Sequence, residues 1–264
     1  MLRFQLEPIE SISPWITDSE PSLSWFALTL GWMVWPVGNQ EIYRYRDGID
    51  ERLGWHADED VPDGFESSVN YQLARPFRDI AECLRHWLEP VPEDVLERVG
   101  GPTHMETVFD RCDALRGSGG SESALEVAEP ALDWCAARRL VSSYLRAGPT
   151  IRACLAGDHV HVMCDTRDRR IDGIQVWTAE TVDEAIPVEE FTASMRSFGS
   201  ALLEQMDDRL KRIEAGYRRP DVRLRPQALR EQHGVEERIW SEACGSGGTI
   251  DWDTVRSALS ILDL

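Results

Sequence analysis

The segment from Leu23 to Tyr45, LSWFALTLGWMVWPVGNQEIYRY, constrains the fold of this chain more than any other. Its tryptophan, phenylalanine and tyrosine side chains flank a Gly38-Asn39 pair, and both of those residues tolerate the positive φ angles of a tight turn. Strands favour aromatic side chains because these pack well on a pleated, half-buried surface. The segment therefore predicts a β-hairpin, with strands at 23–35 and 40–46, that forms one wall of a hydrophobic core.

The spacing of the tryptophans also predicts which face of the sheet each one occupies. Side chains alternate between the two faces of a strand. Trp25 and Trp35 therefore share one side, and Trp32 faces the other unless a bulge near Gly31 intervenes. We expect at least one large aromatic side chain on the second face of this sheet.

Helical periodicity is clearest between residues 188 and 216, where large apolar side chains recur at steps of three and four. Proline favours the first helical position, so Pro130 is taken as the start of another helix. All predicted helices are at 74–88, 92–99, 130–140, 188–216, 226–243 and 251–262. Predicted strands outside the hairpin are at 3–9, 142–146, 149–156, 159–166 and 174–181.

This order of elements predicts an α+β fold. An antiparallel sheet is built from two hairpin regions, 3–46 and 142–181, and is covered by the long amphipathic helix and by further C-terminal helices. With 264 residues, 42% hydrophobic residues and ten tryptophans, the chain can bury a sizeable core. We expect a single domain over 1–264, with residues 245–264 as a candidate C-terminal helical extension.

Several features favour a cytoplasmic protein. No apolar run reaches the ~18 residues that a membrane span needs, and the first residues, MLRFQLEPIE, lack the apolar core of a secretory signal. The six cysteines are scattered without a C-x-x-C pair, which indicates reduced and mostly buried thiols. The sequence predicts no metal cluster of cysteines and no disulfide framework.

The net charge of −19 limits the kinds of macromolecule that the protein can bind. Such a charge disfavours binding to nucleic acid and to anionic membranes, and it permits attraction to a basic protein. Acidity also serves solubility, and this alternative needs no partner at all. The oligomeric state is left open by the sequence.

The residues from 47 to 66, here called the acidic loop, hold eight acids and one base. Glycine and proline in this segment indicate a loop. Clustered carboxylates bind hard divalent cations, but the spacing here does not match an EF-hand. We predict a partner-binding surface in which four acids supply charge and two aromatic side chains supply apolar anchors, namely Asp58, Glu59, Asp60, Asp63, Trp55 and Phe65. The alternative is a solvated loop without a partner.

A second candidate site is the pair His159 and His161 on a predicted strand. Alternation places both imidazoles on one face, about 6.5 Å apart along the strand. With a carboxylate from Asp158 or from elsewhere, they could hold a metal ion. Two exposed histidines without a metal are the plainer alternative.

Other chemistry is not indicated by the sequence. The basic stretch from Arg209 to Arg230 could bind phosphate, but in so acidic a chain we expect it to pair with the acidic loop. The segment Arg116–Ser121, RGSGGS, lacks the lysine of a phosphate-binding loop, and no nucleophile motif is present. We predict no catalytic residues and no cofactor.

Four segments together resemble an uncharacterised bacterial family known only as a domain of unknown function. These are LSWFALTLGWMVWPVGNQEIYRY, SYLRAGPTIRACLAGDHVHV, PVEEFTASMRSFGSALLEQMDDRL and LREQHGVEERIW. The likeness extends from about residue 3 to 240 and consists of aromatics and turns. It implies one fold unit and a bacterial cytosolic setting, and it implies no activity.

The sequence thus favours a non-enzymatic binding module, acting like an immunity or inhibitor protein for a basic partner. An alternative is a small-ligand or metal-binding enzyme with a cleft centred on His159 and His161. A further alternative is an assembly subunit that uses the apolar face of the 251–264 helix.

Overall fold

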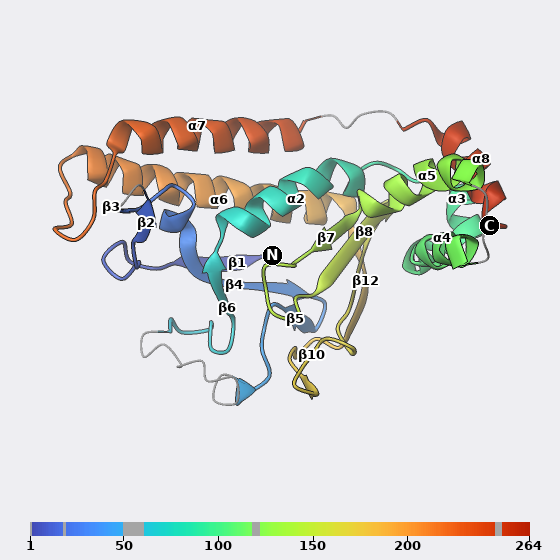
Figure 1. Cartoon of the computed structure of the whole chain (residues 1–264), viewed down its shortest axis with the longest axis horizontal. Helices are drawn as coiled ribbons and strands as arrows, with labels where there is room; N and C mark the ends of the chain where they lie inside the picture. The colour runs from blue at the N-terminus through green and yellow to red at the C-terminus, as the bar shows by residue number, and fades with distance from the viewer. Residues whose placement is uncertain (1, 18–19, 50–60, 118–121, 246–249) are drawn as a thin grey trace.

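The computed structural model of the chain describes residues 2–17, 20–49, 61–117, 122–245 and 250–264. It has an α+β fold with antiparallel sheets, as the sequence predicts. Two long helices run side by side over two sheets, and a group of shorter helices gathers at one end (Figure 1). None of the described helices combines the length and hydrophobicity that crossing a bilayer requires.

The first sheet is organised around strand β4, Leu30–Val37. It pairs with β1 (Arg3–Leu6), β5 (Gln40–Ile42) and β6 (Val69–Gln72), all antiparallel. The predicted turn is correct, since Val37 pairs with Gln40 across Gly38, which has a φ of +57°.

The start of the predicted hairpin is shorter than expected. Strand β4 begins only at Leu30, because the residues before it form a 3-10 turn, η1 (Ala27–Thr29). The Thr29 hydroxyl donates to the Phe26 carbonyl and accepts from the Ala74 amide at 2.9 Å. These side-chain hydrogen bonds satisfy backbone groups locally, so this part of the chain does not need a strand partner.

The second sheet has the strand order β12-β9-β8-β7. Its strands are β7 (Arg139–Val141), β8 (Thr150–Ala156), β9 (His159–Asp165) and β12 (Thr181–Pro187). The two hairpin regions therefore form two sheets, joined by an isolated bridge between Tyr45 and Trp177. Two small hairpins complete the strands, β2 (Trp15–Thr17) with β3 (Glu20–Ser22) and β10 (Arg170–Ile171) with β11 (Ile174–Gln175).

The strand predicted at 174–181 is largely wrong. Only its first two residues, in β11, and its last residue, where β12 begins, belong to strands. Val176 and Trp177 are buried, at 0% and 1% exposure. Their apolar character reflects burial of a connecting segment, which a short apolar run does not distinguish from a strand.

The long helix α6, Val188–Glu214, confirms the predicted amphipathic helix. Its buried face meets α2 (Ala74–Trp87) and α7 (Pro226–Ala243) through Phe77, Phe198 and Trp240, whose rings contact one another. Gly199 permits this close approach, because a Cβ there would lie 2.0 Å from the Trp240 indole.

The remaining helices are α3 (Glu93–Val99), α4 (Thr107–Gly117), α5 (Glu122–Ala136) and α8 (Trp252–Ile261), with a 3-10 turn η2 (Pro102–His104). The prediction that a helix starts at Pro130 is wrong, since α5 begins at Glu122 and contains Pro130. The eight residues before the proline are mostly good helix formers, and they outweigh the one hydrogen bond that a proline removes.

The apolar side chains form two main clusters. The first core lies between the two sheets and α2, α6 and α7, and its largest members are Trp25, Trp35, Trp87, Trp177, Phe77 and Phe198. The second core lies among α3, α4, α5 and α8, and includes Val95, Val108, Ala131, Trp134, Val255 and Leu259. Strands β8 and β9 separate the two, since Val162 faces the first core and Met163 the second.

The C-terminal helix α8 packs into the second core rather than projecting from it. Val255, Leu259 and Leu262 are all less than 5% exposed. Trp252 meets Trp134 edge to face at 6.0 Å between ring centroids. The apolar face that suggested an assembly role is thus covered by α5 of the same chain.

Candidate functional site

The arginines of the described residues are mostly engaged within the chain. Arg3 and Arg44 both bind Glu41, and Arg230 binds Asp207 and Glu214. Others donate to backbone carbonyls, as Arg209 does to Leu28 and Glu7. Many carboxylates of the described residues form no ion pair with an arginine or lysine. The excess negative charge is therefore concentrated at these unpaired carboxylates.

The acidic loop is described at its two ends. Trp55, Asp58, Glu59 and Asp60 lie outside the described residues, so their place in the partner-binding surface stays a prediction. Asp63 is described and its side chain is exposed. The loop end from Val61 onward lies beside the second face of the first sheet.

Phe65 fixes this loop end to the sheet. Its side chain is 9% exposed and packs with Trp32 and Val34, which face away from the first core. Trp32 therefore lies on the second face of the sheet, as the alternation predicts. Because the Phe65 ring is buried, we assign it to holding the loop on the sheet, and a partner would meet the residues around it.

Hydrogen bonds reinforce that attachment. Arg44 donates to the carbonyls of Gly64 (3.1 Å) and Glu66. The Ser68 hydroxyl donates to the Phe65 carbonyl at 2.7 Å, and the Tyr45 amide donates to Ser67. The Gly64 amide donates to the Glu66 carboxylate, which lowers the pKa of Glu66. The end of the acidic loop is thus held in one conformation with Asp63 at the surface.

His159 and His161 lie on one face of β9, as predicted, but they differ in environment. The Nδ1 atom of His159 is 2.6 Å from an oxygen of Asp158, and the hydrogen bond from His159 lowers the pKa of that carboxyl. His161 stands opposite Cys154 and Ala185. Burial lowers its pKa, against the opposing effect of Asp183.

Within the described parts of the chain, no three potential metal ligands gather in one place. The metal hypothesis for His159 and His161 therefore stays a prediction without a third ligand to support it. The small-ligand hypothesis placed a cleft at these two residues, and the cleft that the structure shows beside this sheet is lined by others.

The basic stretch pairs differently from the prediction. Arg223 binds Glu20 at 2.9 Å, and Arg212 binds Glu10 at 2.5 Å. Arg219 donates to the carbonyls of Ile9 and Ile12, besides its ion pair with Asp221. As far as the described residues go, these arginines attach the C-terminal helices to residues 9–20 and not to the acidic loop.

A cleft of about 370 Å³ runs between the β4–β5 turn and the junction of β12 with α6. Its walls are formed by residues 35–38 of the turn, 184–187 of β12, and Glu190, Phe191, Ser194 and Met195 of α6. Trp35, Val37, Phe191 and Met195 form an apolar floor and are at most 2% exposed. Glu184 and Glu190 stand at the rim, so the cleft combines an apolar floor with negative charge.

A cluster of buried polar side chains lies behind α2, and the sequence gives no sign of it. The Tyr43 and Ser142 hydroxyls are 2.8 Å apart and fully buried. One oxygen of Asp79 and the Tyr144 hydroxyl are buried nearby without a hydrogen bond. Burial raises the pKa of Asp79 to about 6, which Arg75 offsets only in part. Asp79 lies in an amphipathic helix, and an aspartate there gives no signal in the sequence. Only its burial in the folded protein identifies it as unusual.

A second acidic surface lies on α5, where Glu122, Glu126, Glu129 and Asp133 recur at steps of three and four and are all exposed. This α5 stripe makes no ion pair with any other described residue. It lies at the helical end of the molecule, remote from the attachment of the acidic loop (Figure 1). Its four carboxylates equal in number the four acids of the predicted partner-binding surface, which makes the α5 stripe a matched reference.

A family profile whose description is "Family of unknown function (DUF5984)" matches residues 1–258. This agrees with the resemblance drawn from the aromatic and turn pattern, and it extends that resemblance to most of α8. None of the curated proteins and none of the solved structures matches the chain.

Proposed function

We propose that this chain, which belongs to the DUF5984 family of unknown function, is a binding protein that captures a basic protein through its acidic loop. The acidic loop is the densest concentration of carboxylates in a chain of net charge −19. In this proposal it acts like an immunity or inhibitor protein of the bacterial cytosol, covering a positively charged surface of its partner.

The observation that carries the proposal is the attachment of the loop end to the sheet. Buried Phe65 and the hydrogen bonds of Arg44 hold residues 64–66 in place and leave the Asp63 carboxylate exposed. A carboxylate next to backbone that is already fixed loses less conformational entropy on binding than one on a free loop. Clustered charge of one sign also steers an oppositely charged partner and speeds its association.

The test is a pulldown from native cytosol at low and high salt, with the bound proteins identified by mass. We expect a basic protein that is retained at low salt and released at high salt, since salt screens exposed charges. The purified partner is then titrated against a variant that reverses Asp58, Glu59, Asp60 and Asp63 to lysine. The expected result is a loss of affinity of at least about a hundredfold, as removal of several steering charges implies.

The matched control reverses Glu122, Glu126, Glu129 and Asp133 of the α5 stripe to lysine. This variant changes the net charge by the same amount and leaves the acidic loop intact. If both variants lose affinity equally, net charge alone explains the binding. If neither does, the partner binds elsewhere, and in both cases the site assignment fails.

A further inference from the structure

The outer edge of β12 has backbone groups that are free to pair with another strand. Among the described strands β12 ends its sheet, with β9 on its inner side. The Val188 amide donates to the Asp158 carbonyl, just beyond the last β9 pair, so even-numbered residues direct their backbone groups toward β9. Backbone groups alternate in direction along a strand. Asp183 and Ala185 therefore present their N–H and C=O groups to the outer edge.

One contact confirms this assignment of the edge. The Gln40 side-chain amide donates to the Thr181 carbonyl at 2.5 Å, from the outer side. That hydrogen bond occupies the outward carbonyl of Thr181, the first residue of β12. The backbone of Asp183 and Ala185 makes no comparable contact with the described residues.

The cleft between the β4–β5 turn and α6 lies along this same edge, since residues 184–187 form one of its walls. Its volume of about 370 Å³ falls within the range of ligand sites. Edge strands are commonly protected by charged side chains and proline, and β12 has Asp183, Glu184 and Pro187. The two carboxylates repel an acidic strand and attract a basic one.

The charged side chains that line the cleft are both negative. Glu184 and Glu190 line it. Neither of these carboxylates forms an ion pair with a described residue. The Glu184 carboxylate lies against Gly38, where a Cβ would come within 2.2 Å of its Oε1 atom. The turn thus positions this carboxylate at the rim of the cleft.

We infer that the cleft beside β12 binds an extended, basic segment of a protein partner, which pairs with the edge at Asp183 and Ala185. A lysine or arginine side chain of that segment lies in the cleft. Its aliphatic part covers the apolar floor formed by Trp35, Phe191 and Met195, and its charged end reaches Glu184 and Glu190. Addition of a strand to a sheet edge supplies the backbone affinity, and the pocket supplies the preference for a cation.

This inference rests on the proposed function only for the kind of partner. The acidic loop and the β12 cleft lie on different elements, and the cleft is tested with synthetic peptides alone. A result for the cleft therefore stands whether or not reversal of the acidic loop abolishes binding of the natural partner.

The probe is the peptide acetyl-Val-Arg-Val-Arg-Val-amide, titrated into the full chain by calorimetry at low and high salt. Two peptides serve as comparisons, one with glutamate in place of both arginines and one with N-methylated backbone amides. We expect saturable binding of the arginine peptide that weakens with salt, and no binding of either comparison peptide.

Two variants locate the peptide. E184Q with E190Q removes both rim charges and should weaken binding about tenfold, the sum of two partly exposed ion pairs. A185P removes the outward N–H, a position at which an edge strand tolerates proline, and should abolish binding. E122Q with E126Q on the α5 stripe makes the same change in charge elsewhere and should leave binding unchanged.

Thermal unfolding of each variant checks that the fold is intact. If A185P does not fold, a series of N-methylated peptides titrated against the wild type replaces it as the measure of backbone pairing. The inference is overturned if the arginine peptide does not bind at millimolar concentration, or if it binds wild type and both cleft variants equally. It is also overturned if the wild type is a dimer that A185P converts to a monomer, because the occupant of the edge is then a second copy of the chain.

Discussion

The first core and the second core of this protein are stabilised in different ways. The first core is built from large aromatic side chains that contact one another directly, with ring centroids 4.8 Å apart for Phe77 and Trp240. The second core is smaller and poorer in aromatics, and exposed ion pairs between α8 and α3 supplement its apolar packing. The comparison is therefore between a core of direct aromatic contacts and a core to which exposed ion pairs also contribute.

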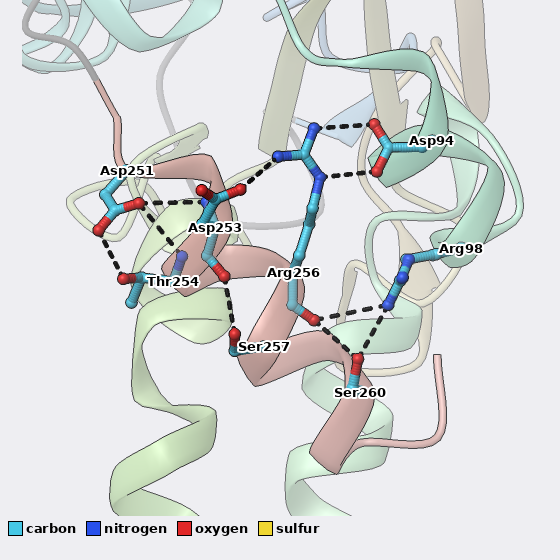
Figure 2. A network of polar contacts seen from close by, with 8 residues as sticks. All are labelled: Asp94, Arg98, Asp251, Asp253, Thr254, Arg256, Ser257 and Ser260. Atoms are coloured by element: carbon cyan, nitrogen blue, oxygen red, sulfur yellow. Dashed lines mark hydrogen bonds and ion pairs between the residues drawn. The ribbon is translucent and has the colours of Figure 1, made fainter.

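Polar contacts at the surface add to the apolar attachment of α8. Arg256 donates to both carboxylate oxygens of Asp94 on α3, at 2.7 and 3.0 Å, and Arg98 reaches Ser260 (Figure 2). Asp251 caps the helix by accepting from the amides of residues 253 and 254. The ion pair raises the pKa of Arg256 and lowers that of Asp94.

One charged pair connects the two cores. Arg138 is fully buried, and its backbone carbonyl accepts from Trp87 of the first core at 2.9 Å. Its guanidinium lies 5.5 Å from the ring centroid of Trp134 in the second core and 3.3 Å from Glu89. Glu89 also accepts from the Ile250 amide, just before α8.

The largest expected effect comes from truncating the first core. Trp240→Ala removes an aromatic side chain that packs on Phe77, Phe198 and Gly199, and should lower the free energy of unfolding by about 3–5 kcal/mol. Urea unfolding measures this loss. Trp252→Ala at the margin of the second core is the comparison, and an equal loss there would remove the distinction between the two cores.

The next effect concerns the connection between the cores. Glu89→Gln leaves the buried Arg138 cation without its carboxylate, which should lower the free energy of unfolding by about 3 kcal/mol. A double variant, Glu89→Gln with Arg138→Met, removes the cation as well and should recover most of that loss. If the double variant is no more stable than the single one, the uncompensated charge is not the cause.

The third test measures the pH dependence of stability that arises from Asp79, which is buried on α2. Asp79 has a folded-state pKa of about 6, raised from 3.8 by burial. A carboxyl with a raised pKa favours the folded state most when protonated, so its contribution is present below pH 4 and is lost between about pH 4 and 6. Asp79→Asn should remove this dependence and stabilise the protein at pH 7 by about 1–3 kcal/mol. Unfolding measured from pH 4 to 7 would show whether the difference between variant and wild type grows as predicted.

The smallest effect is expected at the surface of the second core. Arg256→Met removes the exposed pairs with Asp94 and Asp253, and should lower the melting temperature only slightly. The loss should disappear at high salt, where the wild-type pairs are screened. A large loss that persists in salt would show that Arg256 contributes more than exposed ion pairs do.

Local patterns predicted much of the fold. The boundaries of α6 and α7 follow from apolar steps of three and four, and the turn at Gly38 follows from one residue that tolerates positive φ. The start of α5 is not apparent from the sequence, because the preference of proline for the first helical position competes with the helix propensity of residues 122–129. Its stripe of exposed acids also weakened the apolar period on which the prediction relied.

The candidate sites were less predictable, for a physical reason. The clustering of acids in the acidic loop is a property of consecutive residues, so the sequence could propose that surface. The β12 cleft joins residues near 35 to residues near 185, and the buried cluster joins Tyr43, Asp79 and Ser142. No local pattern records which distant residues a strand edge or a helix will meet.

The sequence by itself determined the α+β class, the long helix, the charge of −19 and the side of the sheet on which Trp32 lies. These depend on periodicity and composition, which are local or summed quantities. Only the tertiary structure decided that the hairpin regions form two sheets, that α8 closes a second core, and that Phe65 is buried while Asp63 is exposed. Those outcomes depend on which surfaces exclude water from one another, and that is settled by contacts between segments far apart in the chain.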